Sequence, residues 1–331
     1  MSSKKLVITT LNCIVFTVIT LILIQQKEHN TDPENIAKFS FVNKSFHRDI
    51  KKSIRLYQSF EKHNTNNNDF FIVIPRSDYE LFQNSFQKLK QSDRIKNLPK
   101  FITDEYIFEK CNINLTKKIP GYLGQQMVKM CFFAISNGDY MTIDSDAFFV
   151  KEIKIESFYK NNKLKTVYGR IKKPDFINRK IYPQQTFDSF KGINKYLKID
   201  SLWITSYIAG AGLWSKNEMI NLVDFMKKNY NMSIKDMIEK CPYEMQWYGS
   251  YVENYSDLYR YNASNFFIVD YQDRTVDEDF YNQECIVDKD ILLIICQNCK
   301  DKKYEKNCNN KQKIIYLKSI TKRFLKKLHL L

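Results

Sequence analysis

The sequence lacks the patterns that mark nucleic-acid-binding proteins. It has neither the cysteine and histidine spacing of a zinc finger nor an aromatic block of the RNP type, so its formal net charge of +15 points instead to an anionic membrane or an anionic small substrate. It also shows no internal repeat. Hydrophobic residues make up 44% and aromatic residues 15% of 331 positions. That content excludes global disorder and suits one large α/β domain with appendages.

Charge is absent from residues 6–24, a run of 19 positions that follows Lys4 and Lys5. At about 1.5 Å per residue, such a run just spans a bilayer, and the lysines before it place the N-terminus in the cytosol. A cleaved signal peptide is the alternative, but residues 25–27 offer no small-x-small cleavage site. We therefore predict a cytosolic tail at residues 1–5, an uncleaved signal anchor at 6–24 and a short stem at 25–37, as in a single-pass type II membrane protein.

Basic residues dominate the other end of the chain. Residues 301–331 predict a basic C-terminal amphipathic helix, with apolar side chains on one face and lysines on the other. Residues 314–331 would then lie on an anionic membrane surface, or would form a solvated helix docked on the core. Four cysteines gather before and within this region, and disulfides among them suit an oxidising compartment. Cys131, by contrast, reads as a core residue.

Apolar runs alternate with amphipathic segments through the first half of the chain. We expect strands near residues 39–42, 70–74, 101–103 and 140–150, and helices near 47–63, 79–89 and 125–135. Later, Ala209-Gly210-Ala211-Gly212 reads as a close-approach loop. The alternation predicts an α/β fold with a doubly wound, mostly parallel sheet flanked by helices, and ligands of such sheets bind beyond the carboxyl ends of the strands.

Two carboxylates lie within the fourth of these apolar stretches. Asp144 and Asp146 lie between the apolar runs 140–143 and 147–150. Two carboxylates in an apolar segment repel one another and are costly to desolvate, and a divalent cation removes both costs. Oxygen ligands suit Mg²⁺ or Mn²⁺, which usually bind substrate phosphates as well. The sequence therefore predicts a metal–diphosphate site at the end of a buried strand.

Three blocks of sequence around this strand resemble one known family. Gly121-Tyr122-Leu123-Gly124-Gln125-Gln126-Met127-Val128-Lys129-Met130 precedes the acidic strand, and it is followed by the blocks at 207–215 and 243–251. In this order they resemble the GT-A glycosyltransferases, and most closely the family DUF6492. The resemblance covers roughly residues 38–275. It implies a GT-A (Rossmann-like) catalytic domain, which we place at residues 38–300, in the Golgi or an equivalent lumen-facing membrane.

The resemblance also implies roles for the acidic pair and for nearby polar residues. Asp146 would contact Mn²⁺ or Mg²⁺ directly, while Asp144 would bind the metal through water or bind hydroxyls of the donor. Many GT-A enzymes supply a third ligand from near the end of the domain, and Asp270 is the substitute that this chain offers. The donor-binding candidates are Lys44, Arg48, Gln126, Lys129 and Asp144.

Glu244 lies among aromatic residues, as carboxylates in sugar-binding pockets do. In an inverting enzyme it would be the general base for the acceptor hydroxyl, and in a retaining enzyme it would position the acceptor. The acceptor-binding candidates are Gly210, Gly212, Trp214, Tyr243 and Trp247.

The predicted function is metal-dependent transfer of a sugar from a nucleotide-sugar donor to a glycan, protein or lipid acceptor. Two alternatives stay open. A nucleotidyltransferase-like enzyme would favour a glycine-rich phosphate loop after the first strand, which Val42-Asn43-Lys44-Ser45 is not. A non-catalytic, membrane-tethered sugar-binding protein would tolerate loss of the metal. An anchor of this kind would also serve a bacterial inner membrane.

Overall fold

The computed structural model describes residues 39–114, 119, 121–172, 184–199, 203–207, 211–262, 267–270 and 292–296. The predicted tail, anchor and stem lie outside these ranges, as do Gly210 and the predicted helix at 301–331. Of the helices in the described ranges, none is long and apolar enough to cross a bilayer.

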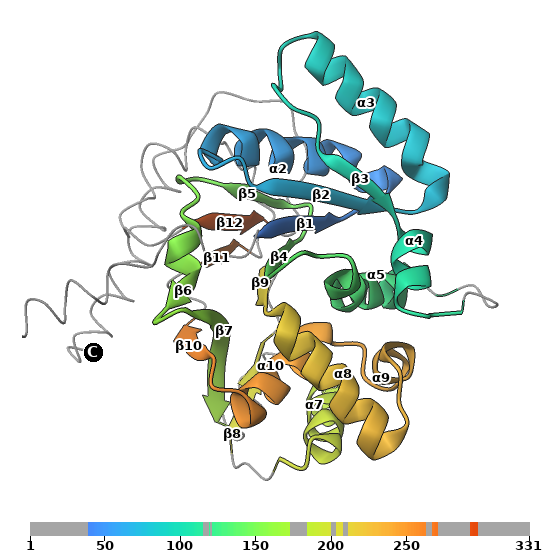
Figure 1. The fold of residues 1–331 in the computed structure, drawn as a ribbon, viewed down its shortest axis with the longest axis vertical. Coiled ribbons are helices and arrows are strands. Elements are labelled where there is room, and N and C mark those ends of the chain that lie inside the picture. The colour runs from blue at the N-terminus through green and yellow to red at the C-terminus, as the bar shows by residue number, and fades with distance from the viewer. Residues whose placement is uncertain are drawn as a thin grey trace, which may run out of the picture.

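The main sheet confirms the predicted α/β class (Figure 1). Within the described ranges its strands follow the order β3-β2-β1-β4-β9, and all neighbours are parallel except β4 and β9. Their bounds are β1 Ser40–Lys44, β2 Asp69–Ile74, β3 Lys100–Thr103, β4 Tyr140–Ile143 and β9 Ala211–Trp214. Since β2 lies on one side of β1 and β4 on the other, the chain reverses its direction of winding between β1 and β4. The carboxyl ends of these two strands therefore form the topological switch point.

Helices cover both faces of this sheet because side chains alternate along each strand. On β1, Phe41 belongs to the core cluster under α2 and α3, whereas Val42 belongs to the cluster under α5, α8, α9 and α10. On β4, Met141 faces the first cluster and Tyr140 the second. The helices are α2 Ile50–His63, α3 Tyr79–Gln91, α4 Asp104–Lys110, α5 Gly121–Cys131, α7 Gln184–Tyr196, α8 Lys216–Tyr230, α9 Ile234–Lys240 and α10 Glu244–Tyr255. Short 3-10 turns precede α2 (η2, His47–Asp49) and α3 (η3, Arg76–Asp78).

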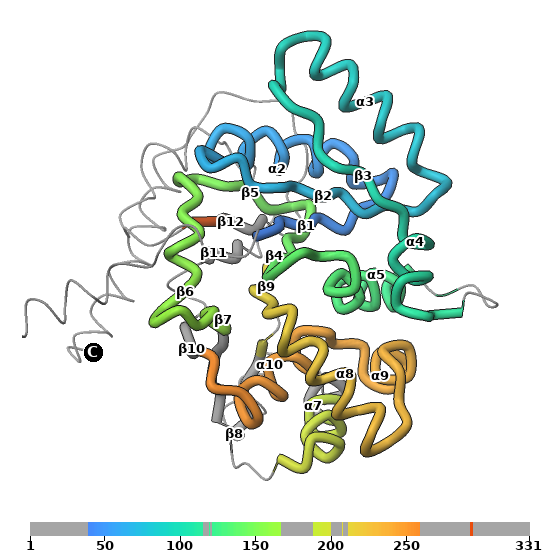
Figure 2. The backbone as a smooth tube through the Cα atoms, viewed as in Figure 1, coloured from blue at the N-terminus to red at the C-terminus, as the bar shows by residue number. Residues whose placement is uncertain are grey.

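Two smaller sheets adjoin the main one. In the first, β11 (Phe267–Asp270) pairs in parallel with β12 (Leu293–Cys296), which pairs antiparallel with β5 (Ala147–Phe149). Figure 2 shows β12, which is late in the chain, running beside β5. In the second, β7 (Lys163–Lys172) pairs with β6 (Tyr159–Lys160), β8 (Trp203–Ser206) and β10 (Tyr259–Asn262).

The structure corrects two predicted boundaries. The helix expected at 125–135 begins at Gly121 and ends at Cys131, so both of its N-terminal glycines are helical. Ala211 and Gly212 are not in a loop but pair with Ile143 and Thr142 in β9. In each case glycine suggested a loop, but packing against neighbouring elements outweighs the modest cost of glycine in regular structure.

Among the glycines that the structure describes, Gly249 in α10 leaves the least room for a Cβ. A Cβ there would lie 2.2 Å from ring atoms of Tyr207, which is itself buried. We expect Gly249→Ala to lower the free energy of unfolding by about 1–3 kcal/mol, because overpacking outweighs the gain in helix propensity. Gly121→Ala is the matched control, since a Cβ there meets nothing within 4 Å. Urea denaturation of both variants measures the difference, and equal stability would contradict this account of Gly249.

Candidate active site

The acidic pair lies in the turn that joins β4 to β5. Asp144, Ser145 and Asp146 follow the carboxyl end of β4, and the backbone N–H of Ala147 donates to the carbonyl of Asp144 at 3.1 Å. The turn is beside the carboxyl end of β1, because Asn43 of β1 pairs with Ile143 of β4. The sequence predicts the acidic pair at the carboxyl end of a strand, and the strand order shows that this end is at the switch point of the sheet.

A buried network of small polar side chains fixes the acidic turn to β1 and α2. The amide nitrogen of Asn43 donates to the carbonyl of Ile143 at 3.0 Å and to Ser145 Oγ at 3.1 Å. Ser53 Oγ of α2 donates to Asn43 Oδ1 at 2.9 Å and shares a hydrogen bond with Ser45 Oγ at 2.7 Å. Satisfied networks of this kind specify a single arrangement, so the turn is held in place before any ligand binds.

Asp146 has the chemistry of a cation ligand. Its Oδ1 is buried and has no hydrogen-bond partner. Burial, together with the neighbouring Asp144, raises the pKa of Asp146 to about 6. A buried carboxylate oxygen that lacks a partner is costly unless it is neutralised, and Mg²⁺ or Mn²⁺ commonly binds through one or two carboxylates and completes its shell with water and phosphate. The pair Asp144 and Asp146 therefore fits a divalent cation. No cluster of three or more His, Cys, Asp or Glu with metal-binding geometry occurs in the described ranges.

Lys129 joins the acidic turn to the start of α10. Its ammonium lies 2.8 Å from Asp144 Oδ1 and 3.2 Å from Glu244 Oε1, and its side chain is only 8% exposed. One turn earlier on α5, the side-chain amide of Gln126 lies against the Glu244 carboxylate, to which its nitrogen donates once the amide is turned to face it. The predicted donor residues Gln126 and Lys129 thus lie on one helix face, and both contact the predicted base.

The two carboxylates keep Lys129 charged. Burial alone would lower the pKa of Lys129, but the charges of Asp144 and Glu244 and their hydrogen bonds outweigh burial, so its pKa is raised. The lysine is therefore a fixed positive charge between one carboxylate of the turn and one of α10. We expect it to bind these two groups in the ligand-free protein rather than to be available to a phosphate.

A cleft of about 810 Å³ opens next to this cluster. Its walls come from the segments after β1, β2 and β3 and from the first turn of α5. Two aromatic rings in it, Phe46 and Tyr122, are 37% and 52% exposed, so both have free faces. Tyr122 also contacts the active-site side of the cleft, since its hydroxyl donates to the carbonyl of Pro242 at 3.1 Å. The cleft and the carboxylates thus belong to one region at the carboxyl edge of the sheet.

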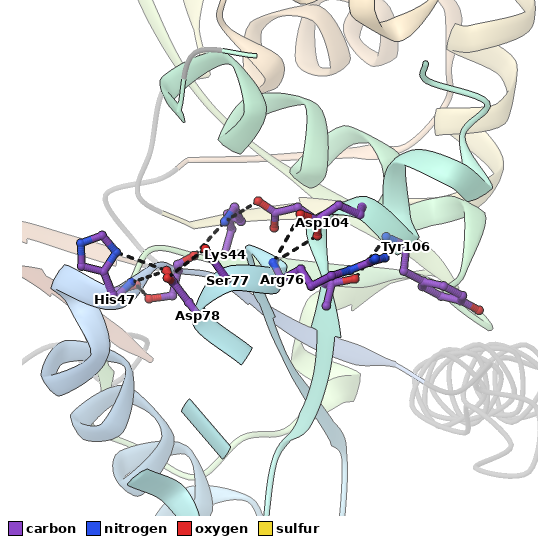
Figure 3. Close-up of polar contacts among 11 residues, drawn as sticks. Lys44, His47, Arg76, Ser77, Asp78, Asp104 and Tyr106 are labelled. Carbon is purple, nitrogen blue, oxygen red and sulfur yellow. Dashed lines mark hydrogen bonds and ion pairs between the residues drawn. The ribbon is translucent and has the colours of Figure 1, made fainter. Parts of the chain in front are cut away.

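Polar contacts among residues that line the cleft tie the three strand ends together (Figure 3). Lys44 Nζ lies 3.0 Å from Asp104 Oδ2 and donates to the carbonyl of Ser45 at 2.7 Å. Asp78 Oδ2 accepts from the backbone N–H of His47 at 2.7 Å, and the His47 ring lies 3.3 Å from the same oxygen. With Glu105, the cleft holds three carboxylates against Lys44 and His47. Its balance of charge disfavours an anion and favours groups that donate hydrogen bonds.

Asp104 gives this cleft a pH dependence. Burial raises the pKa of Asp104 to about 6, although Lys44 opposes the rise. This value exceeds the pKa of about 3.9 in the unfolded chain, so as the pH falls the folded protein binds a proton at Asp104 before the unfolded chain does. Above pH 6 the buried charge therefore lowers the stability of the fold, and this loss disappears as the pH falls towards 4. The slope of the unfolding free energy against pH is proportional to the difference in bound protons between the folded and unfolded states. We expect Asp104→Asn to reduce that difference by up to about one proton between pH 4 and 6. Urea denaturation across this range tests it, and an unchanged slope would contradict it.

The remaining predicted residues lie in three kinds of place. Arg48 is exposed on η2 and does not line the cleft. Trp214 and Trp247 are fully buried, and their indole N–H groups donate to Thr142 Oγ1 and to the Cys241 carbonyl. Both tryptophans therefore stabilise the core and present no surface to an acceptor. Gly212 is packed under Met245, whose Sδ would lie 2.4 Å from an added Cβ.

Tyr243 and Asp270 belong to elements that adjoin those of the site, α10 and β11. Tyr243 is partly exposed at the N-terminal boundary of α10, directly before Glu244. Asp270 is the last residue of β11 and pairs with Cys296 of β12. The residue before Cys296, Ile295, pairs in turn with Ala147 of β5. Two strand spacings, about 9–10 Å, thus separate the backbone of Asp270 from the end of the acidic turn. Its role as a third metal ligand stays a prediction.

Sequence reasoning missed Asn43, Ser53, Tyr122 and Asp104. Asn43 reads as part of a turn and Ser53 as an ordinary helix residue, and only the pairing of β1 with β4 shows what they bind. Tyr122 lies in the block Gly121–Met130, but the predicted helix began only at residue 125. A helix that begins at Gly121, as α5 does, would have predicted the exposed ring of Tyr122 in its first turn. Asp104 follows a predicted strand, and its position at a carboxyl end was the available signal.

Comparison with known proteins gives one family and several distant structures. Residues 34–182 match the model of a family of unknown function, DUF6492. No curated protein matches the chain. Among solved structures, the chain is similar to the apo form of the bifunctional glycosyltransferase WbbM, at 12% identity and a TM-score of 0.48, over 84% of this chain and 48% of that one. It is also similar to the apo form of mouse xyloside xylosyltransferase 1, at 9% identity and a TM-score of 0.42, over 80% of this chain and 99% of that one.

The chain therefore spans about half the length of the WbbM structure. The family match includes the Gln-Gln-x-x-Lys helix and the acidic strand, while the blocks at 207–215 and 243–251 lie beyond it. The predicted resemblance to DUF6492 is thus confirmed over residues 34–182.

Proposed function

We propose that the chain is a metal-dependent glycosyltransferase of the GT-A kind, which moves a sugar from a nucleotide-sugar donor to a glycan, protein or lipid acceptor. One observation carries the proposal: a preformed acidic turn at the switch point of the sheet contains a buried, unpartnered carboxylate oxygen, that of Asp146. The cleft of about 810 Å³ supports it, because Ser45 lines this cleft and lies 3.1 Å from Ser145 Oγ of the turn. The predicted anchor at residues 6–24 would place the domain in the Golgi or an equivalent lumen.

In this proposal the nucleoside of the donor binds in the cleft and its diphosphate binds at the acidic turn. The cleft suits the uncharged nucleoside, because its exposed rings offer stacking surfaces and its carboxylates accept from N–H and hydroxyl groups. The diphosphate belongs at the acidic turn, where Asp144 and Asp146 would hold Mn²⁺ or Mg²⁺. That ion, when bound, would offset the charge of the leaving diphosphate. Lys44 holds Asp104 in place, and so supports the nucleoside end rather than a phosphate.

Glu244 stays the candidate for contact with the acceptor. It is only 7% exposed, and it is oriented by Gln126 and Lys129. An inverting transfer would use its carboxylate to accept the proton of the acceptor hydroxyl, whereas a retaining transfer would use it to position the acceptor. The anomeric configuration of the product distinguishes the two.

A donor panel tests the proposal. The full-length chain in detergent is incubated with UDP-, GDP- and CMP-sugars, with Mn²⁺, with Mg²⁺ or with EDTA, and release of the nucleotide is measured. We expect cleavage of one donor class, loss of that cleavage in EDTA and its recovery on adding metal.

The two alternatives give different results in the same assay. A nucleotidyltransferase-like enzyme would leave all donors intact but, in a parallel incubation with a nucleoside triphosphate and a sugar phosphate, would release diphosphate. A non-catalytic sugar-binding protein would show neither reaction. Either outcome would overturn the proposal.

A further inference from the structure

Two cysteines that line neither the cleft nor the acidic turn lie against one another. Cys111 directly follows α4, and Cys131 is the last residue of α5, which packs on α4. The sulfur of Cys111 lies 3.5 Å from the backbone carbonyl oxygen of Cys131 and donates to it. Both are free thiols. The sequence predicts Cys131 to be a core residue, which the structure confirms, but 19 intervening residues conceal its proximity to Cys111.

The two thiols differ in their access to solvent. Cys131 is fully buried in the cluster beneath α5 and α8, whereas Cys111 is partly exposed and packs against the edge of that cluster. Burial raises the pKa of the Cys131 thiol, and its contact with Cys111 raises it further. A thiol reagent from solvent therefore meets Cys111 first, and Cys131 is positioned to react only with what Cys111 carries.

We propose that Cys111 and Cys131 are a redox-active pair that closes reversibly into a disulfide linking the end of α4 to the end of α5. The oxidant is a small disulfide such as oxidised glutathione. The Cys111 thiolate attacks one of its sulfurs, forming a mixed disulfide and releasing one glutathione thiolate. The Cys131 thiolate then displaces the second glutathione. In sum, two protein thiols lose two protons and two electrons, and one glutathione disulfide becomes two glutathione thiols.

The two cysteines are close enough to form this disulfide without straining the backbone. A disulfide needs Cα atoms about 4.4–6.8 Å apart, and a thiol that already hydrogen-bonds the other cysteine's own carbonyl is within reach of such a separation. The bond would fix the far ends of two helices whose near ends, Asp104 and Gly121, both line the cleft. Oxidation would thereby hold α4 and α5 together without adding any group to the cleft.

Peptide mapping tests the pair directly. The full-length chain, reduced and then desalted, is incubated folded with oxidised glutathione, alkylated and digested with trypsin without reduction. Cleavage after Lys110, Lys117, Lys129 and Lys151 gives peptides 111–117 and 130–151, and each contains one of the two cysteines and no other. We expect these peptides to appear as one linked species in most molecules, 2 Da lighter than their sum. We also expect the melting temperature to rise by about 5 °C or more.

Variants separate this bond from other oxidation. Cys111→Ser should abolish both the linked species and the rise in melting temperature. Cys241→Ser is the matched control, because Cys241 is also a buried free thiol, bonded to the Ser189 carbonyl, and should leave both results unchanged. If Cys131→Ala fails to fold, Cys111→Ser still decides the question, because its thiol is partly exposed. Glutathione retained on Cys111, or either cysteine linked to another of the eight cysteines, would overturn the proposal.

Discussion

Replacing Asp146 by asparagine should lower sugar transfer by about 100-fold or more while leaving the protein at least as stable as before. The carboxylate has a buried oxygen with no partner, and burial with Asp144 raises its pKa to about 6. Asparagine keeps the shape but removes the charge that would bind the cation. Activity with the cleaved donor in Mn²⁺ and urea denaturation of the same preparation measure the two effects.

The gain in stability from Asp146→Asn should increase with pH. Because the folded pKa of Asp146 lies above the unfolded value of about 3.9, its charge costs stability above pH 6, and this cost fades as the pH falls towards 4. Asp146→Asn should therefore gain most at pH 7–8 and least near pH 4. Asp93→Asn is the control, since Asp93 is exposed in a left-handed turn (φ 53°) that asparagine also favours. Turnover that survives in Asp146→Asn would rule out its role as a metal ligand.

Replacing Lys129 by methionine should lower the free energy of unfolding by about 3–5 kcal/mol. Methionine has nearly the same length, so packing is retained while the charge is lost. Glu244, which is 7% exposed, would then keep a buried charge near Asp144 with no cation between them. Urea denaturation at pH 7 gives the loss, and the variant should also lose transfer activity because both carboxylates depend on this lysine for their position.

Two further variants show whether the loss comes from charge. Lys235→Met removes a surface pair with Glu239 at i,i+4, where the expected loss is under about 0.5 kcal/mol. In the double variant Lys129→Met with Glu244→Gln, the buried charge on α10 is gone, so part of the lost stability should return. Losses that simply add would show that Lys129 and Glu244 act independently, against the contacts described above.

The sequence predicts the acidic turn well because its determinants are local. Apolar residues before Asp144 and after Asp146 dictate two short buried strands with a polar turn between them. The alternation of strands and helices then puts that turn at the carboxyl edge of the sheet. What the sequence does not reveal is the contact of Lys129 with Glu244, which are separated by 115 positions. Such a contact depends on how α10 docks on α5, and no local pattern encodes that.

Trp214 and Trp247 illustrate the converse error. Tryptophan and tyrosine near a carboxylate are typical of sugar-binding pockets, yet they are also the largest side chains available for a core. Here Trp214 stacks on Tyr140 at 5.9 Å and packs against Tyr248, and Trp247 contacts Tyr196. The exposed rings in the cleft belong instead to Phe46 and Tyr122. Composition alone does not distinguish these environments, because the same residue types serve both.

The central position of β1 has a consequence for how the chain is made. Of the strands in the described ranges β1 is the first to be synthesised, yet one of its two neighbours, β4, pairs with it across 100 positions of sequence. At a synthesis rate of roughly 5–20 residues per second, about 5–20 s pass between the synthesis of β1 and that of β4, and this edge of β1 is unpaired during that time. During this interval an apolar strand with unpaired backbone groups is open to wrong pairing. We expect the yield of folded protein to depend on how quickly residues 45–140 are translated, and on the chaperones that occupy this edge in the meantime.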